Sequence, residues 1–133
     1  MADRMIEAAL AAREKAYARY SQFRVGAALL CERGLVHAGC NVENAAYPQG
    51  VCAEAGAIAA LILSGSRRIE AVVVAGGGTG PCTPCGGCRQ KIREFAAPHT
   101  QIRVVDPAGT LLLVRSLAEL LPDSFGPDSL DPA

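Results

Sequence analysis

Two short segments, Val51-Cys-Ala-Glu54 and Thr83-Pro-Cys-Gly-Gly-Cys88, decide the fold and the chemistry expected of this 133-residue chain. Together they carry three thiols and one carboxyl group, those of Cys52, Cys85, Cys88 and Glu54. A structural zinc ion is closed by four protein ligands, whereas a catalytic zinc ion takes three and leaves the fourth tetrahedral position to water. The segments therefore predict a catalytic zinc site with a carboxyl group beside its water.

The two segments are more specific together than either is alone. A lone Cys-x-x-Cys also occurs in redox pairs, iron–sulfur proteins and structural zinc sites. A Cys-x-Glu upstream of Pro-Cys-x-x-Cys is the pattern of zinc deaminases, in which the glutamate is a general acid and base. We expect Cys52, Cys85 and Cys88 to bind Zn²⁺, and Glu54 to transfer protons while water displaces an amino group as ammonia.

Length, charge and hydropathy limit the class of protein. The chain suits one domain, residues 1–133, with a single core. Thirteen basic and thirteen acidic residues without a basic run indicate no nucleic-acid partner. The longest apolar run, 55–63, is far short of the ~20 residues that cross a bilayer, so no membrane partner is expected. Charges in the first seven residues argue against a signal peptide, and the six cysteines suit a reducing, cytoplasmic location.

Hydrophobic periodicity predicts the element order αββαβαββα. Helices are expected at 3–20, 51–63, 88–96 and 116–121, and strands at 23–31, 35–41, 71–75, 102–105 and 110–114. Only residues 106–109 join the last two strands, too few for a parallel crossover, so these strands should be antiparallel. We therefore expect an α/β fold with three layers, α/β/α, around a five-stranded mixed sheet. The tail 122–133, rich in Pro and Asp, is by default expected to be loosely ordered.

Nearly the whole chain resembles the small, homotetrameric, zinc-dependent cytidine deaminases of pyrimidine salvage. Besides the two zinc segments, the resemblance is carried by Tyr20-Ser-Gln-Phe-Arg-Val-Gly-Ala-Ala-Leu29, Gly39-Cys-Asn-Val-Glu-Asn-Ala-Ala-Tyr-Pro48 and Glu119-Leu-Leu-Pro-Asp-Ser-Phe-Gly-Pro127. It implies a cytidine-deaminase-like fold and deamination of cytidine and deoxycytidine to uridine and deoxyuridine. It also implies a homotetramer with one Zn²⁺ per subunit and a small nucleoside as substrate.

The resemblance also implies substrate-binding residues. Asn41 and Glu43 match positions that hold the ribose hydroxyls, and an amide and a carboxylate suit groups that both donate and accept. Phe23 matches an aromatic residue that lies against the pyrimidine, and the backbones of Ala53 and Cys85 would contact the base. From the residues alone, Phe23 could instead belong to the core, and Asn41 and Glu43 could be turn residues.

Two further aromatic residues match positions that reach a neighbouring subunit's site. They are Tyr47 and Phe125, and the second would give the tail 122–133 a function. One departure concerns charge, because members of the family often carry Arg directly after the catalytic Glu and this chain has Ala55. Three thiolates leave a zinc site with a formal charge of −1, and Arg89 or the helix ends are candidates to offset it.

Several alternatives follow from the remaining cysteines. Cys82 could be an incidental loop thiol, a fourth ligand that closes the zinc, or an iron–sulfur ligand. A closed site would make the chain a non-enzymatic four-cysteine metal-binding module. A separate alternative concerns the substrate and not the cysteines: the chain could be a deaminase of the same fold that acts on a modified nucleoside or a nucleoside-like antibiotic. Cys31 and Cys40 are expected to be small buried residues, and neither His37 nor His99 is expected to bind metal.

Overall fold

The computed structural model describes residues 3–130, in which five strands form one mixed sheet of order β2-β1-β3-β4-β5. The strands are β1 (Gly26–Cys31), β2 (Val36–Cys40), β3 (Ile69–Ala75), β4 (Ala96–Val105) and β5 (Leu111–Ser116). β3 and β4 are parallel, and the other neighbouring pairs are antiparallel. The predicted five-stranded mixed sheet with an antiparallel last pair is confirmed.

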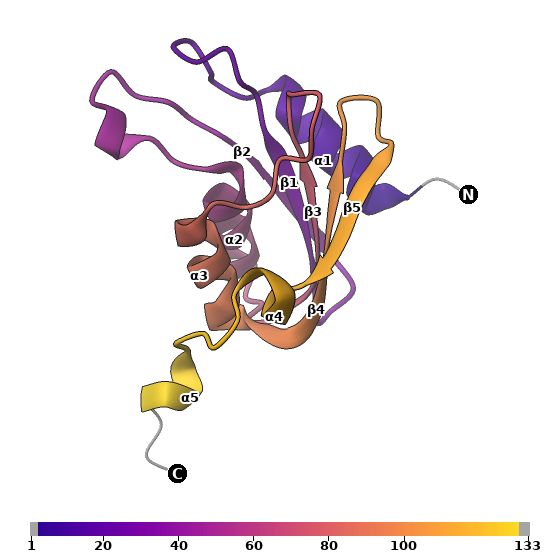
Figure 1. Ribbon diagram of the computed structural model, residues 1–133, viewed down its shortest axis with the longest axis vertical. Helices are drawn as coiled ribbons and strands as arrows, with labels where there is room; N and C mark the ends of the chain where they lie inside the picture. The colour runs from indigo at the N-terminus through magenta and orange to yellow at the C-terminus, as the bar shows by residue number, and fades with distance from the viewer. Residues whose placement is uncertain (1–2, 131–133) are drawn as a thin grey trace.

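Helices cover both faces of this sheet (Figure 1). They are α1 (Arg4–Glu14), α2 (Ala53–Leu63), α3 (Gly86–Phe95), α4 (Leu117–Leu120) and α5 (Pro127–Leu130), with a short 3-10 helix, η1 (Tyr47–Gln49). α1 packs on one face, mainly against β1, β2 and β3, while α2 and α3 lie on the other. The three-layer α/β/α architecture expected from the sequence is confirmed.

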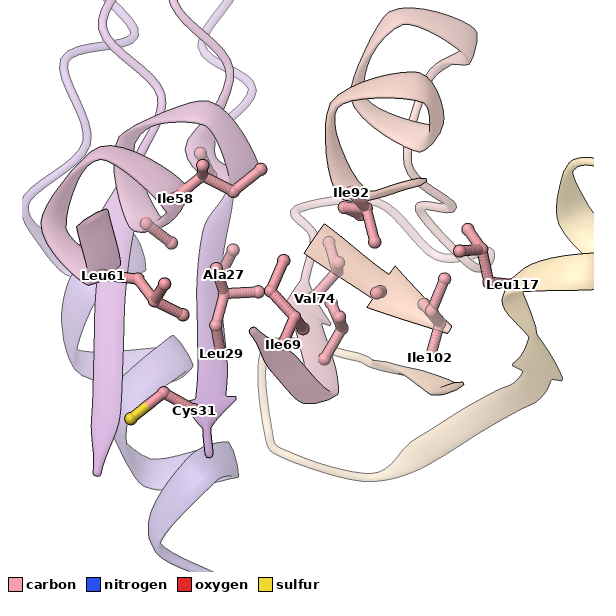
Figure 2. Packing of buried hydrophobic residues seen from close by; sticks show 14 residues of the cluster. Ala27, Leu29, Cys31, Ile58, Leu61, Ile69, Val74, Ile92, Ile102 and Leu117 are labelled. Atoms are coloured by element: carbon pink, nitrogen blue, oxygen red, sulfur yellow. The ribbon is translucent and has the colours of Figure 1, made fainter. Parts of the chain in front are cut away.

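Alternating side chains of the central strands feed two separate cores. Ala28, Val73 and Ala75 point toward α1, where Met5 and Ala9 are buried. The strand side chains between them face the other way and pack with α2, α3 and α4 (Figure 2). This second core contains Ala27, Leu29, Cys31, Val72, Val74 and Ile102 from the strands, and Leu61, Ile92 and Leu117 from the helices. The second core fixes α2 and α3, the two helices whose first residues carry the metal-binding motifs.

α2 approaches β2 unusually closely because of a glycine. A Cβ atom on Gly39 would overlap the backbone nitrogen of Ala57 in α2. Only glycine lets the two backbones come this near. The contact sets the height of α2 above the sheet, and with it the position of Cys52 at the helix start.

Several element boundaries differ from the prediction, and the largest shifts are at the end of α1 and the start of β4. α1 ends at Glu14 instead of Tyr20, because the Tyr17 backbone pairs with the 41–43 segment: its N–H donates to Asn41 O at 2.9 Å, and its carbonyl accepts from Glu43 N at 2.9 Å. α3 begins two residues early, at Gly86, β4 begins at Ala96, and α2 begins one residue after Cys52. Long-range pairing, which periodicity does not report, overrides helix propensity after residue 14.

The expectation of a loosely ordered tail is wrong for residues 122–130. Arg93 of α3 donates from Nε to Ser124 Oγ at 2.8 Å and from Nη2 to Asp128 at 2.7 Å. Gln90 of the same helix donates to the carbonyl of Phe125 at 2.8 Å. The segment is thus held along α3 and includes the short helix α5. The predicted tail also includes residues 131–133, which lie outside the described range.

Helices of the described range are too short or too polar to cross a bilayer.

Candidate active site

The starts of α2 and α3 bring three cysteines together. Cys52 is the N-cap of α2, Cys85 is the N-cap of α3, and Cys88 lies in the first turn of α3. Their three Sγ atoms all lie within 4.8 Å of one another, and within residues 3–130 they form the one cluster of metal-ligating side chains with this spacing. Sulfurs bound to one tetrahedral zinc at ~2.3 Å are roughly 3.8 Å apart, so the group fits zinc.

Electrostatics at the helix starts favour a bound cation. The backbone N–H of Cys88 hydrogen-bonds the Cys85 sulfur and lowers the pKa of that thiol. Burial, with the nearby charge of Glu54, raises the pKa of Cys88. Helix N-termini assist negative charge, but three thiolates this close repel one another. A divalent cation bound among the sulfurs offsets this repulsion, so the three cysteines are suited to bind a metal ion.

Glu54 is the second residue of α2 and is 4% exposed. Burial raises the pKa of its carboxyl group, and the charge of Lys91 opposes that shift. A carboxyl group with a raised pKa binds a proton more readily than an ordinary glutamate does, which suits a group that has to accept a proton and pass it on. This is the property that the sequence motif predicts for the residue.

A cavity of about 160 Å³ opens beside the three cysteines. Its lining residues are Val25, Asn41, Cys52, Ala53, Glu54, Cys82, Thr83 and Cys85. Five residues predicted from the sequence thus meet in one place. Cys82 lines this cavity but is not part of the three-sulfur group, so the closed four-cysteine site is not formed.

Asn41 lines this cavity together with Cys52 and Cys85, whereas Phe23 is not among its lining residues. The Asn41 side chain accepts from Val25 N at 2.9 Å and donates to Phe23 O at 2.9 Å, which ties the two segments together. Phe23 is 41% exposed, so the alternative that it belongs to the core is wrong. Its ring faces Gly78, where an added Cβ atom would lie 3.5 Å from the ring edge.

Glu43 is held by a residue that the sequence reasoning did not single out, Ser21. Glu43 Oε1 accepts from the backbone N–H groups of Tyr20 at 2.8 Å and Ser21 at 3.1 Å, and Oε2 accepts from the Ser21 hydroxyl. These bonds, above all the Ser21 hydroxyl, lower the pKa of Glu43. Ser21 Oγ in turn accepts from Phe23 N at 2.9 Å. The spacing of Ser21 two residues before Phe23 is the sequence signal that could have identified it.

A second hollow, of about 400 Å³, lies next to Glu43. Tyr20, Ser21, Glu43, Asn44, Tyr47 and Gly50 line it. Tyr47, in η1, is 77% exposed and stands edge-on to Tyr20 with ring centroids 6.2 Å apart. The loop that carries η1 projects at the upper left of Figure 1, whereas the C-terminal segment with α5 lies at the lower left. Phe125, 58% exposed, lines neither cavity.

Comparison with known proteins agrees with this site. The family model described as "Cytidine and deoxycytidylate deaminase zinc-binding region" matches residues 1–104. The chain belongs to this family. A cytidine deaminase of Sporosarcina psychrophila is 39% identical over 128 residues, covering 96% of this chain and 93% of that protein. The solved cytidine deaminase of Burkholderia pseudomallei is 45% identical, with a TM-score of 0.86, covering 94% of this chain and 100% of that chain.

A cytidine deaminase of Mycobacterium tuberculosis H37Rv is 40% identical over 115 residues, covering 86% of this chain and 82% of that protein. Family membership and the three-sulfur cluster together confirm the cofactor: Cys52, Cys85 and Cys88 bind zinc. The chain is a zinc-dependent hydrolase of the deaminase family, as its sequence predicts, with a nucleoside as the implied substrate.

Proposed function

We propose that the chain catalyses hydrolytic deamination of cytidine and deoxycytidine, giving uridine and deoxyuridine with release of ammonia. The observation that carries the proposal is the buried Glu54 carboxyl group in the cavity that Cys52 and Cys85 line. The relatives in three bacterial genera, each named as a cytidine deaminase and matching most of this chain, support the substrate.

Bound zinc would supply a Lewis acid that makes a water molecule nucleophilic near neutral pH. The protein's part is to move protons. Glu54 would take a proton from the attacking water and deliver it to ring N3, and would then take the second proton of that water, from the hydroxyl group added at C4, and pass it to the leaving amino group, so that ammonia departs and the C4 carbonyl forms. Its burial supports this cycle, because a carboxyl group with a raised pKa returns protons readily.

The rest of the cavity would orient the nucleoside. The backbones of Ala53 and Cys85 would contact the base, and the ring of Phe23 would lie against the pyrimidine. Asn41 and Glu43 would hold the ribose hydroxyls. Asn41 lines the small cavity with the metal ligands, and Glu43, two residues further along the chain, lines the second hollow; these positions support a substrate with a base at the metal and a sugar pointing outward.

The test is direct. Purified protein is mixed with cytidine, and uridine and ammonia are measured with and without a zinc chelator. Turnover that the chelator abolishes and added zinc restores supports the proposal. A panel of cytosine, cytidine, deoxycytidine, modified cytidines and nucleoside-like antibiotics assayed in parallel identifies the substrate. A preference for an antibiotic or a modified nucleoside over both natural nucleosides would contradict it.

We also propose that the active form is a cytoplasmic homotetramer in which Tyr47 and Phe125 reach a neighbouring subunit's site. Support comes from the large exposure of both aromatic side chains and from the projection of the two segments that carry them. Co-expression tests it. Subunits carrying Glu54→Gln and subunits carrying Phe125→Ala should recover part of the activity when they assemble together. Failure to recover activity in proven mixed oligomers would contradict the sharing of Phe125 between subunits.

A further inference from the structure

The side chain of Arg89, directly after the zinc ligand Cys88, makes three hydrogen bonds that cross between two parts of the chain. Nε donates to the carbonyl of Pro84 at 2.7 Å, and Nη2 donates to Thr83 Oγ1 at 3.2 Å. Nη1 donates to the carbonyl of Leu120, at the end of α4, at 2.7 Å. The guanidinium therefore lies between the loop that leads into Cys85 and the start of the C-terminal segment.

The loop that Arg89 holds has few other constraints. Residues 76–85 belong to no helix or strand, and the glycines at 76, 77, 78 and 80 give the backbone wide freedom. Pro84 is fully buried and immediately precedes Cys85. The hydrogen bonds from Arg89 to Thr83 and Pro84, together with the burial of Pro84, fix the direction from which the Cys85 thiol enters the metal site.

The charge of Arg89 is also left free. Arg89 takes part in none of the ion pairs formed within residues 3–130, and its three acceptors are neutral. Arginine keeps its charge at all ordinary pH values. This half-buried positive charge stands beside Thr83 and Pro84, directly before the ligand Cys85.

We propose that Arg89 is a positioning residue of the zinc site: it fastens the loop before Cys85 to the end of α4 and so holds that ligand in place. Groups that orient metal ligands from outside the coordination sphere typically change metal affinity 10- to 100-fold when removed. The proposal concerns retention of zinc, so it stands or falls independently of which nucleoside the enzyme uses.

The same helix offers a matched control in Arg93, one turn further on. Arg93 is also partly buried and also holds the C-terminal segment, through Ser124 and Asp128, with its guanidinium packed on Gly126. It makes no hydrogen bond to residues 76–85 within the described structure. Replacing Arg93 therefore disturbs the tail without touching the zinc loop.

The experiment measures the rate at which zinc-loaded protein loses its metal to a coloured chelator in excess. Arg89→Gln should release zinc at least about tenfold faster than the wild type. Arg89→Lys should release it nearly as fast, because one ammonium group cannot span acceptors on both sides. Arg93→Gln should stay within about twofold of the wild type, since its partners lie outside the loop.

Three outcomes would overturn the proposal. If Arg89→Gln loses zinc at the wild-type rate, the residue does not hold the site. If Arg93→Gln loses zinc as fast as Arg89→Gln, the effect belongs to general loosening of the tail. If Arg89→Lys loses zinc at the wild-type rate while Arg89→Gln loses it faster, a positive charge is enough and the bridge is not needed.

Hydrogen exchange on zinc-loaded Arg89→Lys gives a second reading that does not depend on the fate of Arg89→Gln. Amides of residues 82–88 and of residues 117–121 should exchange faster together, while β1 and β3 stay protected. An increase confined to one of the two segments, or spread over the whole sheet, would contradict the bridge.

Discussion

The metal-binding half of the site and the half that faces the sugar are held by different means. The zinc ligands and Glu54 stand at the starts of α2 and α3, which the main core fixes against the sheet. Phe23, Asn41 and Glu43 stand on loops that hydrogen bonds between residues 16 to 23 positions apart hold together. The chemistry is thus anchored in rigid secondary structure, whereas recognition depends on loops that hold one another.

This difference implies separable defects. A change at the helix starts should abolish the chemical step or lose the metal, while leaving the loops as they are. A change in the loops should weaken substrate binding, while leaving zinc and the chemical step largely intact.

The largest effect is expected in the metal half, from Glu54→Gln. The amide cannot move protons, so kcat should fall at least ~10²–10⁴-fold. Zinc content, measured by atomic absorption, should stay at the wild-type level because Glu54 is not a ligand. A variant that keeps near-normal kcat, or one that loses its zinc, would contradict the role assigned to this carboxyl group.

A smaller effect is expected in the loop half, from Glu43→Gln. Hydrogen bonds to a charged group are worth about 1.5–3 kcal/mol, so losing that charge should raise KM for cytidine roughly 10- to 100-fold. Zinc content should not change. Glu70→Gln, which removes a carboxylate near the start of β3, is the control and should behave as the wild type. A fall in kcat without a rise in KM would place Glu43 in the chemical step.

Outside both halves, Asp3 tests stability alone. Its carboxylate caps α1 through Met5 N and Ile6 N, and the hydrogen bond from Arg103 lowers the pKa of Asp3. Asp3→Ala should therefore cost about 1 kcal/mol of unfolding free energy near neutral pH and leave kcat unchanged.

The pH dependence of this effect follows from the lowered pKa. A carboxyl group whose pKa is lower in the folded state stabilises the protein above its unfolded pKa, and this contribution disappears as pH falls through the folded value. Urea unfolding of both proteins should thus show a difference that is constant above about pH 5 and shrinks toward about pH 3. A difference that grows on acidification would contradict the charged cap.

No effect on the metal is expected from Cys82→Ser. Cys82 lines the cavity but lies outside the group of three sulfurs. Zinc content and the thermal midpoint should match the wild type, and kcat should change less than about threefold because serine nearly preserves the volume. Loss of zinc in this variant would revive the four-cysteine site.

The sequence predicts the metal half well because its residues fall in two short motifs. Cys-x-Glu and Cys-x-x-Cys each occupy a helix start, where the spacing within each motif places its own side chains, and the packing of α2 and α3 on the sheet then brings the two helix starts together. The sheet can also be predicted from the sequence. The apolar runs of β1 and β3 supply side chains to two cores, and the short Asp106–Gly109 turn requires the last two strands to be antiparallel.

The loop half is less predictable because its contacts join distant residues. Periodicity extends the first helix to Tyr20, but the pairing of Tyr17 with Asn41 and Glu43 ends it. Ser21 looks like an ordinary loop residue until Glu43 is placed against it. The contacts of Arg93 and Gln90 with the tail are likewise invisible in composition, which indicates only proline and charge.

X-ray absorption at the zinc edge of the loaded protein is the most direct test of the open coordination position on which the proposed chemistry depends. Three sulfur ligands at ~2.3 Å and one oxygen ligand at ~2.0 Å are expected, with the oxygen retained in Cys82→Ser. A first shell of four sulfurs, with no oxygen, would contradict a position open to water.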